Sequence, residues 1–196
     1  MATDSERGRH VIQRAQVTIH IGGVFAAREP TVIKTLLGSC IAACLRDRVT
    51  GIGGMNHFML PTTPNGAIDG DLARFGVHAM ELLIGQIQRL GGERARLQAK
   101  IFGGGHVLAI PDSPNGVPQQ NIRFIRDFLS TEGIPLLAHD LGGRVARHVL
   151  FDTASGKVKM KRIACGTMVS TVTEADHEAV AERAMQQYGE ITLFGD

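Results

Sequence analysis

The stretch that most constrains the fold is residues 34–47, which run KTLLGSCIAACLRD. Gly38 and Ser39 form a glycine-led turn between two short apolar runs, and Cys40 follows the turn directly. Runs this short and this apolar are typical of buried elements. Glycine adopts backbone angles closed to other residues, so the amides after Gly38 can turn toward a group beside the thiol. The pattern therefore predicts a thiol at the mouth of a turn, with core on both sides.

A second segment, residues 53–61 (GGMNHFMLP), places His57 in otherwise apolar surroundings. A thiol is a strong nucleophile only as a thiolate, and a neighbouring imidazole is a common way to hold it ionised. The separation from Cys40 to His57 matches one strand, a turn and the neighbouring strand, so the two side chains can face each other across a hairpin. The alternative is an inert core cysteine and a core histidine with satisfied polar atoms. The residue pattern alone leaves both open.

The periodicity of the chain predicts a single α+β domain. Apolar runs and alternation predict strands at 15–21, 31–37, 41–46, 52–60, 94–102, 145–151 and 157–163. Helical spacing predicts a helix over 71–90 and a second helix capped by Asn121. We expect layered, β-sandwich-like sheets flanked by two or three helices.

The chain of 196 residues has the length of one domain with tails. We expect a flexible N-terminal tail at 1–13, a catalytic domain at 14–163 and a C-terminal extension at 164–196. Thr173 and Asp176 have the spacing of a capping box, so the extension is expected to contain one helix over 174–188.

Composition excludes several classes of protein. A hydrophobic content of 43% with 20% charged residues is not that of a disordered chain, and no apolar run is long enough for membrane insertion. The net charge of +2 is small and the basic residues are scattered, so nucleic acid is not an expected partner. The first residues lack a secretory signal, and three cysteines fit a reducing compartment. We expect a cytoplasmic location.

Two further patterns in the sequence resemble ligand sites. The run Gly103–Gly105 is followed by His106 and Val107 rather than by lysine and a hydroxyl residue, which favours a turn or a close strand approach over a phosphate loop. Cys40, Cys44 and His57 lack the second close pair of ligands that structural zinc requires, and Cys44 is expected in the core. We therefore expect no metal and no cofactor.

Several blocks of the sequence resemble the CheD family of chemoreceptor glutamine deamidases, and the resemblance covers about residues 17–163. The blocks are LGSC at 37–40, GGMNHFMLP at 53–61, AKIFGGG at 99–105, Asn121, GIPLLAHDLGG at 133–143 and FDTASGKVKMKRI at 151–163. The resemblance implies Cys40 as nucleophile, His57 as base and Thr35 as the third catalytic residue. In some members the threonine lies one position earlier, where this chain has Lys34.

The resemblance also implies an activity: a protein-glutamine deamidase that converts receptor glutamines to glutamate through a cysteine thioester in bacterial chemotaxis. The backbone amides around Ser39 and Cys40 would then stabilise the oxyanion, because Gly38 leaves the turn free to aim them. Asn56 and His139 are expected to contact the substrate, although His139 also fits an ordinary surface histidine.

The partners that the resemblance implies are the cytoplasmic helices of methyl-accepting chemoreceptors and, in some relatives, a response-regulator phosphatase. Residues 62–70 are expected to form a loop at the site, and the basic residues of 157–162 are either a solvated strand face or a dock for an acidic partner. Two alternatives stay open: a non-catalytic adaptor that binds receptors or a phosphatase, and a thiol protease or transglutaminase with different substrate access.

Overall fold

The computed structural model describes residues 14–60, 70–107, 114–164 and 191–194. The strands are β1 Ala15–Thr18, β2 Val24–Ala27, β3 Thr31–Leu37, β4 Ile41–Asp47, β5 Gly53–Phe58, β6 Leu97–Gly103, β7 Leu136–Leu141, β8 Val145–Asp152, β9 Val158–Ala164 and β10 Ile191–Phe194. The helices are α1 Gly70–Arg89, α2 Val117–Thr131 and the short 3₁₀ helix η1 Arg94–Arg96.

The described strands form two five-stranded sheets. Sheet A has the order β1-β3-β8-β9-β10, and sheet B has the order β2-β5-β4-β6-β7. Pairing is antiparallel except between β1 and β3 and between β6 and β7, which are parallel. Each sheet combines strands from both halves of the chain, so β3 and β8, which are far apart in sequence, are neighbours.

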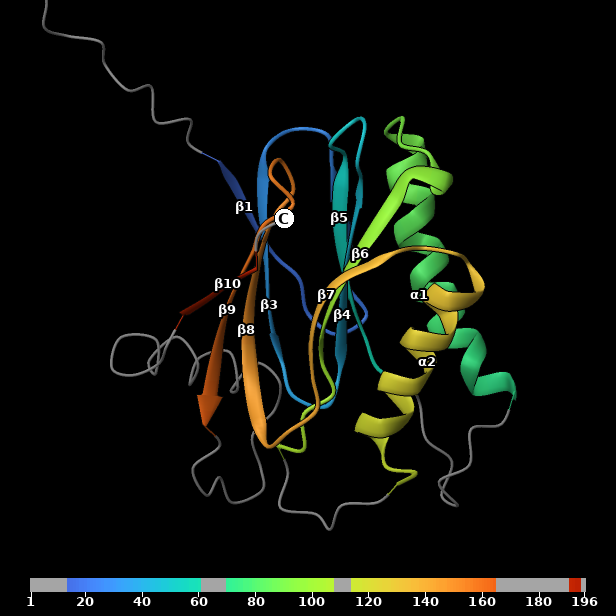
Figure 1. The fold of residues 1–196 in the computed structure, drawn as a ribbon, viewed down its shortest axis with the longest axis vertical. Coiled ribbons are helices and arrows are strands. Elements are labelled where there is room, and N and C mark those ends of the chain that lie inside the picture. The colour runs from blue at the N-terminus through green and yellow to red at the C-terminus, as the bar shows by residue number, and fades with distance from the viewer. Residues whose placement is uncertain (1–13, 61–69, 108–113, 165–190, 195–196) are drawn as a thin grey trace, which may run out of the picture.

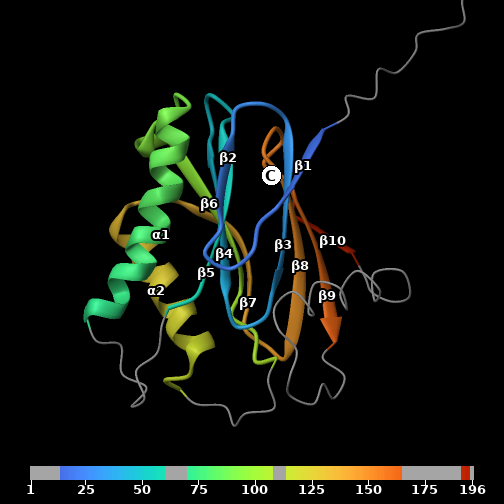
Figure 2. The ribbon, with the colours of Figure 1, turned by 180° about the vertical axis from the view of Figure 1, so that it is seen from behind.

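The three layers are visible from both sides, with sheet A outermost, sheet B in the middle and the helices α1 and α2 on the far face of sheet B (Figures 1 and 2). One buried cluster fills the space between the two sheets and includes Leu37, Val149 and Phe151 from sheet A with Cys40 and Phe102 at sheet B. A second cluster lies between sheet B and the helices. Sheet B is therefore covered on both faces, which explains why all six residues of β5 and six of the seven residues of β4 are buried.

Helix α1 forms because its apolar residues recur every three or four positions. Met80, Leu83, Ile84 and Ile87 are fully buried against sheet B, whereas the residues between them are exposed or half-buried. Such a stripe is the pattern of a helix that covers one face of a sheet. The turn after the helix contains Gly91, with a φ of 101° that favours glycine.

The predicted layered α+β fold is confirmed, and several elements lie where the sequence places them. The strand predicted at 31–37 matches β3, and the helix predicted at 71–90 matches α1 within one residue. The strands predicted at 145–151 and 157–163 are β8 and β9, which pair antiparallel. The strand Val24–Ala27 was not predicted. Its four residues, Val-Phe-Ala-Ala, are all apolar, so the sequence shows no polar–apolar alternation there, and all four are half-buried.

The prediction that Asn121 caps the second helix was wrong. Helix α2 begins at Val117 after the N-cap residue Gly116, with Pro118 in the first turn, and Asn121 lies inside the helix. Residues 1–13 and 62–69 and the predicted helix at 174–188 lie outside the described residues. Within the predicted extension, β10 pairs with β9, Ile191 opposite Lys161 and Phe194 opposite Val158.

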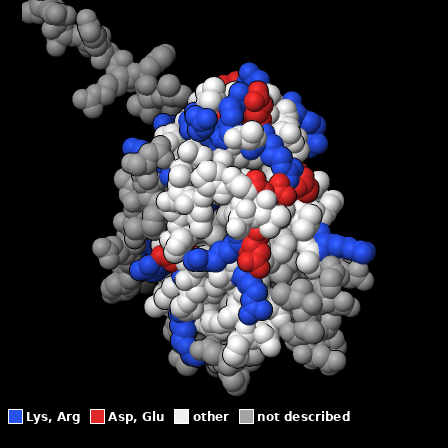
Figure 3. Space-filling model, turned by 45° about the vertical axis from the view of Figure 1, so that its right-hand side comes forward, with Lys and Arg blue, Asp and Glu red and all other residues white. Residues whose placement is uncertain are grey.

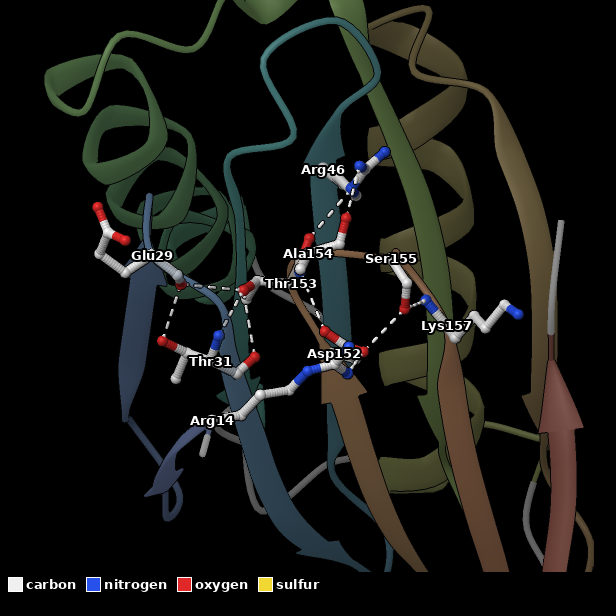
Figure 4. Close-up of polar contacts among 9 residues, drawn as sticks. All are labelled: Arg14, Glu29, Thr31, Arg46, Asp152, Thr153, Ala154, Ser155 and Lys157. Carbon is white, nitrogen blue, oxygen red and sulfur yellow. Dashed lines mark hydrogen bonds and ion pairs between the residues drawn. The ribbon is translucent and has the colours of Figure 1, made fainter. Parts of the chain in front are cut away.

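The turn between β8 and β9 forms hydrogen bonds with both sheets, at the end of the molecule where β3 begins (Figure 4). The hydroxyl of Thr153, 1% exposed, accepts the N–H of Thr31 at 3.1 Å and lies 3.1 Å from the Thr31 carbonyl. The Arg46 guanidinium, at the end of β4, donates to the carbonyls of Thr153 and Ala154 at 3.1 and 2.8 Å. This turn therefore connects sheet A to sheet B.

The charged surface is mixed in sign. On the face shown in Figure 3, Lys and Arg side chains lie next to Asp and Glu side chains and are separated by broad uncharged areas. Among the described residues, Arg94 forms ion pairs with both Glu81 and Glu132 at 2.6 Å. Neither of the two α-helices that the structure describes has the length and apolarity to cross a membrane.

Candidate active site

Cys40 lies in the turn between β3 of sheet A and β4 of sheet B, and its side chain is buried with 4% exposure. The carbonyls of Gly38 and Cys40, on either side of Ser39, accept hydrogen bonds from backbone amides. Gly105 N–H donates to the Gly38 carbonyl and Gly104 N–H donates to the Cys40 carbonyl, each at 2.8 Å. The turn is therefore fixed by the segment that follows β6.

The run Gly103–Gly105 approaches the Cys40 turn too closely for side chains. Gly103 has a φ of 117°, and a Cβ there would collide with the Cys40 carbonyl oxygen. A Cβ on Gly105 would lie 2.5 Å from the carbonyl oxygen of Val145. These contacts support the interpretation of the three glycines as a close backbone approach rather than a phosphate loop.

His57 lies on β5, 1% exposed, and pairs with Ala42 of β4. Directly paired residues share one face of an antiparallel sheet, and alternate residues of a strand share a face. Cys40 and Ala42 belong to the cluster between the sheets, so His57 faces the same space and is diagonal to Cys40. The hairpin geometry predicted for Cys40 and His57 is present.

Thr35 reaches His57 from the opposite sheet. Its Oγ1 lies 2.8 Å from His57 Nδ1 and 2.8 Å from the carbonyl oxygen of Ile19. A carbonyl only accepts, so the single hydroxyl proton of Thr35 is donated to Ile19. His57 Nδ1 must then carry the proton and donate it to Thr35, which leaves the lone pair of the neutral ring on Nε2.

The register of β3 distinguishes Thr35 from the neighbouring Lys34. Strand residues alternate between faces, and Ile33, Thr35 and Leu37 are buried while Lys34 is only half-buried. Ile33 and Leu37 belong to the cluster between the sheets, so Thr35 faces His57 and Lys34 faces away. Thr35, rather than Lys34, therefore carries the side chain that meets His57.

The backbone freedom invoked for Gly38 was the wrong reason for a glycine at this position. The described glycines with positive φ do not include Gly38. A Cβ at Gly38 would instead lie 2.7 Å from Cγ2 of Val107. The glycine therefore makes room for the Val107 side chain, which packs over the turn.

Asn56 makes structural contacts. It is fully buried, its Oδ1 accepts the Ala43 N–H at 3.1 Å, and its Nδ2 donates to the Ala79 carbonyl of α1 at 3.0 Å. Both ends of the amide therefore bond groups on the helix side of sheet B. The expected contact with substrate stays a prediction.

His139 is exposed on β7 and lines an open hollow of about 440 Å³ at one edge of the two sheets. The neighbouring Asp140 is buried and bonds Arg147 of β8 at 2.7 Å as well as Arg162 of β9. Because β7 belongs to sheet B, these ion pairs connect the sheets. The role of His139 in substrate contact stays a prediction.

Cys44 is a core thiol. It is 2% exposed and belongs to the cluster between the sheets. Burial raises the pKa of the Cys44 thiol far above its ordinary value, and the nearby charge of Lys100 offsets only part of that shift. Within the described ranges, no three His, Cys, Asp or Glu side chains form a group suited to a metal ion.

Sequence reasoning missed the position of Asn121. This side chain is fully buried, and it donates to the Ser39 carbonyl at 3.0 Å and accepts the Leu60 N–H at 2.8 Å. Pro118, Asn121, Ile125 and Phe128 are buried at helical spacing. In the sequence, a polar residue within this otherwise apolar helical stripe was the signal that could have indicated a buried hydrogen-bonding role for Asn121.

Fold and site together define a class: layered α+β proteins in which a histidine between two sheets is oriented by a threonine and faces the same space as a buried cysteine. The family model described as CheD chemotactic sensory transduction matches residues 59–162. The chain belongs to the CheD family.

Three relatives show how far the similarity extends. "Probable chemoreceptor glutamine deamidase CheD" of Bordetella petrii is 44% identical over 80% of this chain and 70% of its own length. "Probable chemoreceptor glutamine deamidase CheD 2" of Chromobacterium violaceum is 48% identical over 77% and 75%. "Probable chemoreceptor glutamine deamidase CheD 1" of Shewanella oneidensis is 42% identical over 96% and 91%.

Proposed function

We propose that the chain is a protein-glutamine deamidase that acts on methyl-accepting chemoreceptors in bacterial chemotaxis. The relatives are named chemoreceptor glutamine deamidases and match most of the chain. The observation that carries the proposal is the bond from His57 to Thr35, because it orients an imidazole on the same face as Cys40. A hydrolytic site needs such an oriented base beside its nucleophile.

In the proposed reaction, the Cys40 thiolate attacks the side-chain carbonyl of a receptor glutamine. The C–S bond forms, the C–N bond breaks, and ammonia leaves with the proton that His57 returns to it. Water then attacks the thioester, His57 accepts a proton from it, and glutamate is released as the thiol re-forms. One water is consumed and one ammonia is produced in each cycle.

His57 acts through Nε2 in this scheme. Thr35 holds the proton on Nδ1, so Nε2 is the nitrogen with a lone pair and can accept the thiol proton of Cys40. The resulting imidazolium keeps its Nδ1–H bond to Thr35. Thr35 therefore acts as a positioning residue through both half-reactions.

The negative charge of the tetrahedral intermediate requires donors that are already in place. The amides of Ser39 and Cys40 supply these donors in our proposal, because the carbonyls on either side of them are held by Gly105 and Gly104. A turn with fixed carbonyls loses little free energy to reorganisation when the charge develops.

The proposed partner of the enzyme is the cytoplasmic helical region of a chemoreceptor, and a cytoplasmic location of the chain is part of the same proposal. A response-regulator phosphatase is a second proposed partner, drawn from the family resemblance. A purely adaptor function would not require the oriented His57 beside Cys40, so we favour the enzyme.

The test is mass spectrometry of receptor cytoplasmic fragments incubated with the protein. Deamidation of glutamine adds one unit of mass and releases ammonia, whereas proteolysis shortens the fragment and transglutamination joins it to an amine. The Cys40→Ser variant serves as the matched control, because it keeps the size of the side chain. Receptor fragments unchanged by the wild-type protein, yet retained by it in a binding assay, would favour the adaptor instead.

A further inference from the structure

The amide of Asn121 occupies the place of a strand–strand hydrogen bond. In the register of β4 and β5, Ile41 pairs with Phe58. Two residues further on, the same register would place Ser39 opposite Leu60. Asn121 bonds both of these residues, through Nδ2 to the Ser39 carbonyl and through Oδ1 to the Leu60 N–H. The side chain thus separates the strand ends and satisfies both backbone groups.

The orientation of this amide is unambiguous. A carbonyl must receive a donor and an N–H must receive an acceptor, so Nδ2 faces Ser39 and Oδ1 faces Leu60. Asn121 is fully buried and its helix, α2, packs against β6 of sheet B. Its position is therefore set by the helix layer and not by the turn that it contacts.

The bond to Ser39 determines where the next amide points. A trans peptide is planar, with its N–H directed opposite to its carbonyl. Fixing the Ser39 carbonyl therefore fixes the direction of the Cys40 N–H. The carbonyls of Gly38 and Cys40 are held by the backbone of Gly105 and Gly104, whereas the Ser39 carbonyl is held by a side chain.

We propose that Asn121 is a positioning residue that aims the backbone amide of Cys40 at the oxyanion of the tetrahedral intermediate. This assignment rests on the proposed thioester chemistry and extends it, because it adds a residue from the helix layer to a site built from the two sheets. Asn121 touches neither substrate nor the reacting atoms; it acts through the Ser39–Cys40 peptide.

The discriminating experiment compares two reactions of Cys40 in the full chain. Acylation by a nitrophenyl ester passes through a tetrahedral oxyanion, whereas alkylation by iodoacetamide is a direct displacement without one. In Asn121→Asp the acceptor for Leu60 remains and the donor to Ser39 is lost. Removing an oxyanion donor costs about 10² to 10³ in rate, so misaiming one is expected to slow acylation roughly 10- to 100-fold.

Alkylation of Cys40 in Asn121→Asp is expected to stay within about twofold of wild type, because its displacement reaction develops no oxyanion. Deamidation of receptor fragments should lose kcat with little change in KM. Thr153→Val is the control, because it also removes a buried hydrogen bond, at the end of the sheets where β3 begins. It should leave the ratio of acylation to alkylation unchanged.

Equal losses of acylation and alkylation in Asn121→Asp would overturn the proposal, because they would show a general disturbance of the thiol. An unchanged acylation rate would overturn it as well. Asn121→Leu, of similar shape and without either bond, provides a second variant, and failure of both variants to fold would mark Asn121 as a residue of the fold alone. If the wild-type protein does not deamidate receptor fragments, the proposed function is refuted. The ratio of acylation to alkylation of Cys40 still tests the role of Asn121 in that case.

Discussion

Thr35 and His57 lie on different sheets, yet their side chains meet at 2.8 Å. Because this contact joins the two sheets, the way the sheets pack fixes the orientation of the imidazole ring. Thr35 orients the ring because its hydroxyl donates its hydrogen bond to the Ile19 carbonyl. The hydroxyl oxygen is then left to accept a hydrogen bond from His57 Nδ1. The tautomer of His57 is thus set by a backbone group of the segment after β1.

Replacing Thr35 by valine should lower kcat and leave the fold intact, because valine keeps the shape but cannot accept the Nδ1 proton. Loss of a general base typically costs about 10² to 10⁴ in rate, and we expect His57→Ala to lie in that range and Thr35→Val to cost less. Thr35→Ser should retain most activity. Steady-state ammonia release measures these three variants and Cys40→Ser. Equal losses in Thr35→Val and Cys40→Ser would mean that the threonine has a larger role.

Cys40 and Cys44 should differ sharply in reactivity at neutral pH. Cys40 faces the same space as His57, whereas burial raises the pKa of the Cys44 thiol and keeps it protonated. Iodoacetamide labelling mapped by peptide mass spectrometry should therefore modify Cys40 first. His57→Ala should slow the labelling of Cys40. Similar labelling of the two cysteines, unaffected by His57→Ala, would contradict the pairing.

Acid stability should depend on Asp47 at the end of β4. Burial alone would raise the pKa of this carboxyl, but hydrogen bonds from Arg96 and from the backbone N–H groups of Glu93, Val49 and Thr50 outweigh burial and hold the pKa well below its ordinary value. The stabilisation is present above the unfolded pKa of about 3.9 and is lost as the pH falls from about 5 toward the lower folded value.

The corresponding variant is Asp47→Asn. It should lower the free energy of unfolding at pH 7 by about 1–3 kcal/mol, since it removes the charge from a buried hydrogen-bonded group. It should also flatten the fall in stability below pH 5. Urea unfolding at several pH values measures both effects. If the free energy of unfolding of the variant falls as steeply below pH 5 as that of wild type, other carboxyls cause the loss of stability in acid.

Gly103→Ala should be strongly destabilising, because the new Cβ meets the Cys40 carbonyl and φ is +117°. Gly133→Ala is the matched control, with a φ of +65° and open space around the new methyl. Left-handed strain alone costs roughly 1–2 kcal/mol for a non-glycine residue, and the control should lose about that much. Chemical denaturation compares them, and an equal loss in both would show that the turn relaxes around the added carbon.

Thr153→Val should reduce stability without changing kcat. The substitution leaves the buried Thr31 N–H without its acceptor, which costs about 1–3 kcal/mol. Cys40 follows the opposite end of β3, so the catalytic turn should be unaffected. Thermal melting and ammonia release, measured well below the melting temperature, separate the two effects. A matching fall in kcat would mean that the two ends of the sheets are coupled.

Local signals in the sequence were sufficient where a residue's environment follows from its neighbours in the chain. The alternation through β3, the apolar stripe of α1 and the hairpin that carries His57 are of this kind. The family resemblance, rather than periodicity, pointed to Thr35. The structure adds that the register of β3 turns Thr35 toward His57, and Lys34 away from it.

The features that were missed depend on partners distant in sequence. Val24–Ala27 becomes a strand by pairing with β5, and its own four residues carry no alternation. Asn121 resembles a helix cap by type, and its contacts to Ser39 and Leu60 follow only from the packing of α2 on sheet B. The glycine at 38 was expected for its backbone angles and is explained by the packing of Val107.

Thr35 and His57 are only 22 positions apart, but their contact depends on much later parts of the chain. Strand β3 is held in sheet A between β1 and β8, and β8 is synthesised long after His57. During translation, the thiol, the base and the hydroxyl therefore emerge together, well before the strand that aligns them. We therefore expect the imidazole to be unoriented in a nascent or partly unfolded chain, and the proposed hydrolase chemistry to require the pairing of β3 with β8.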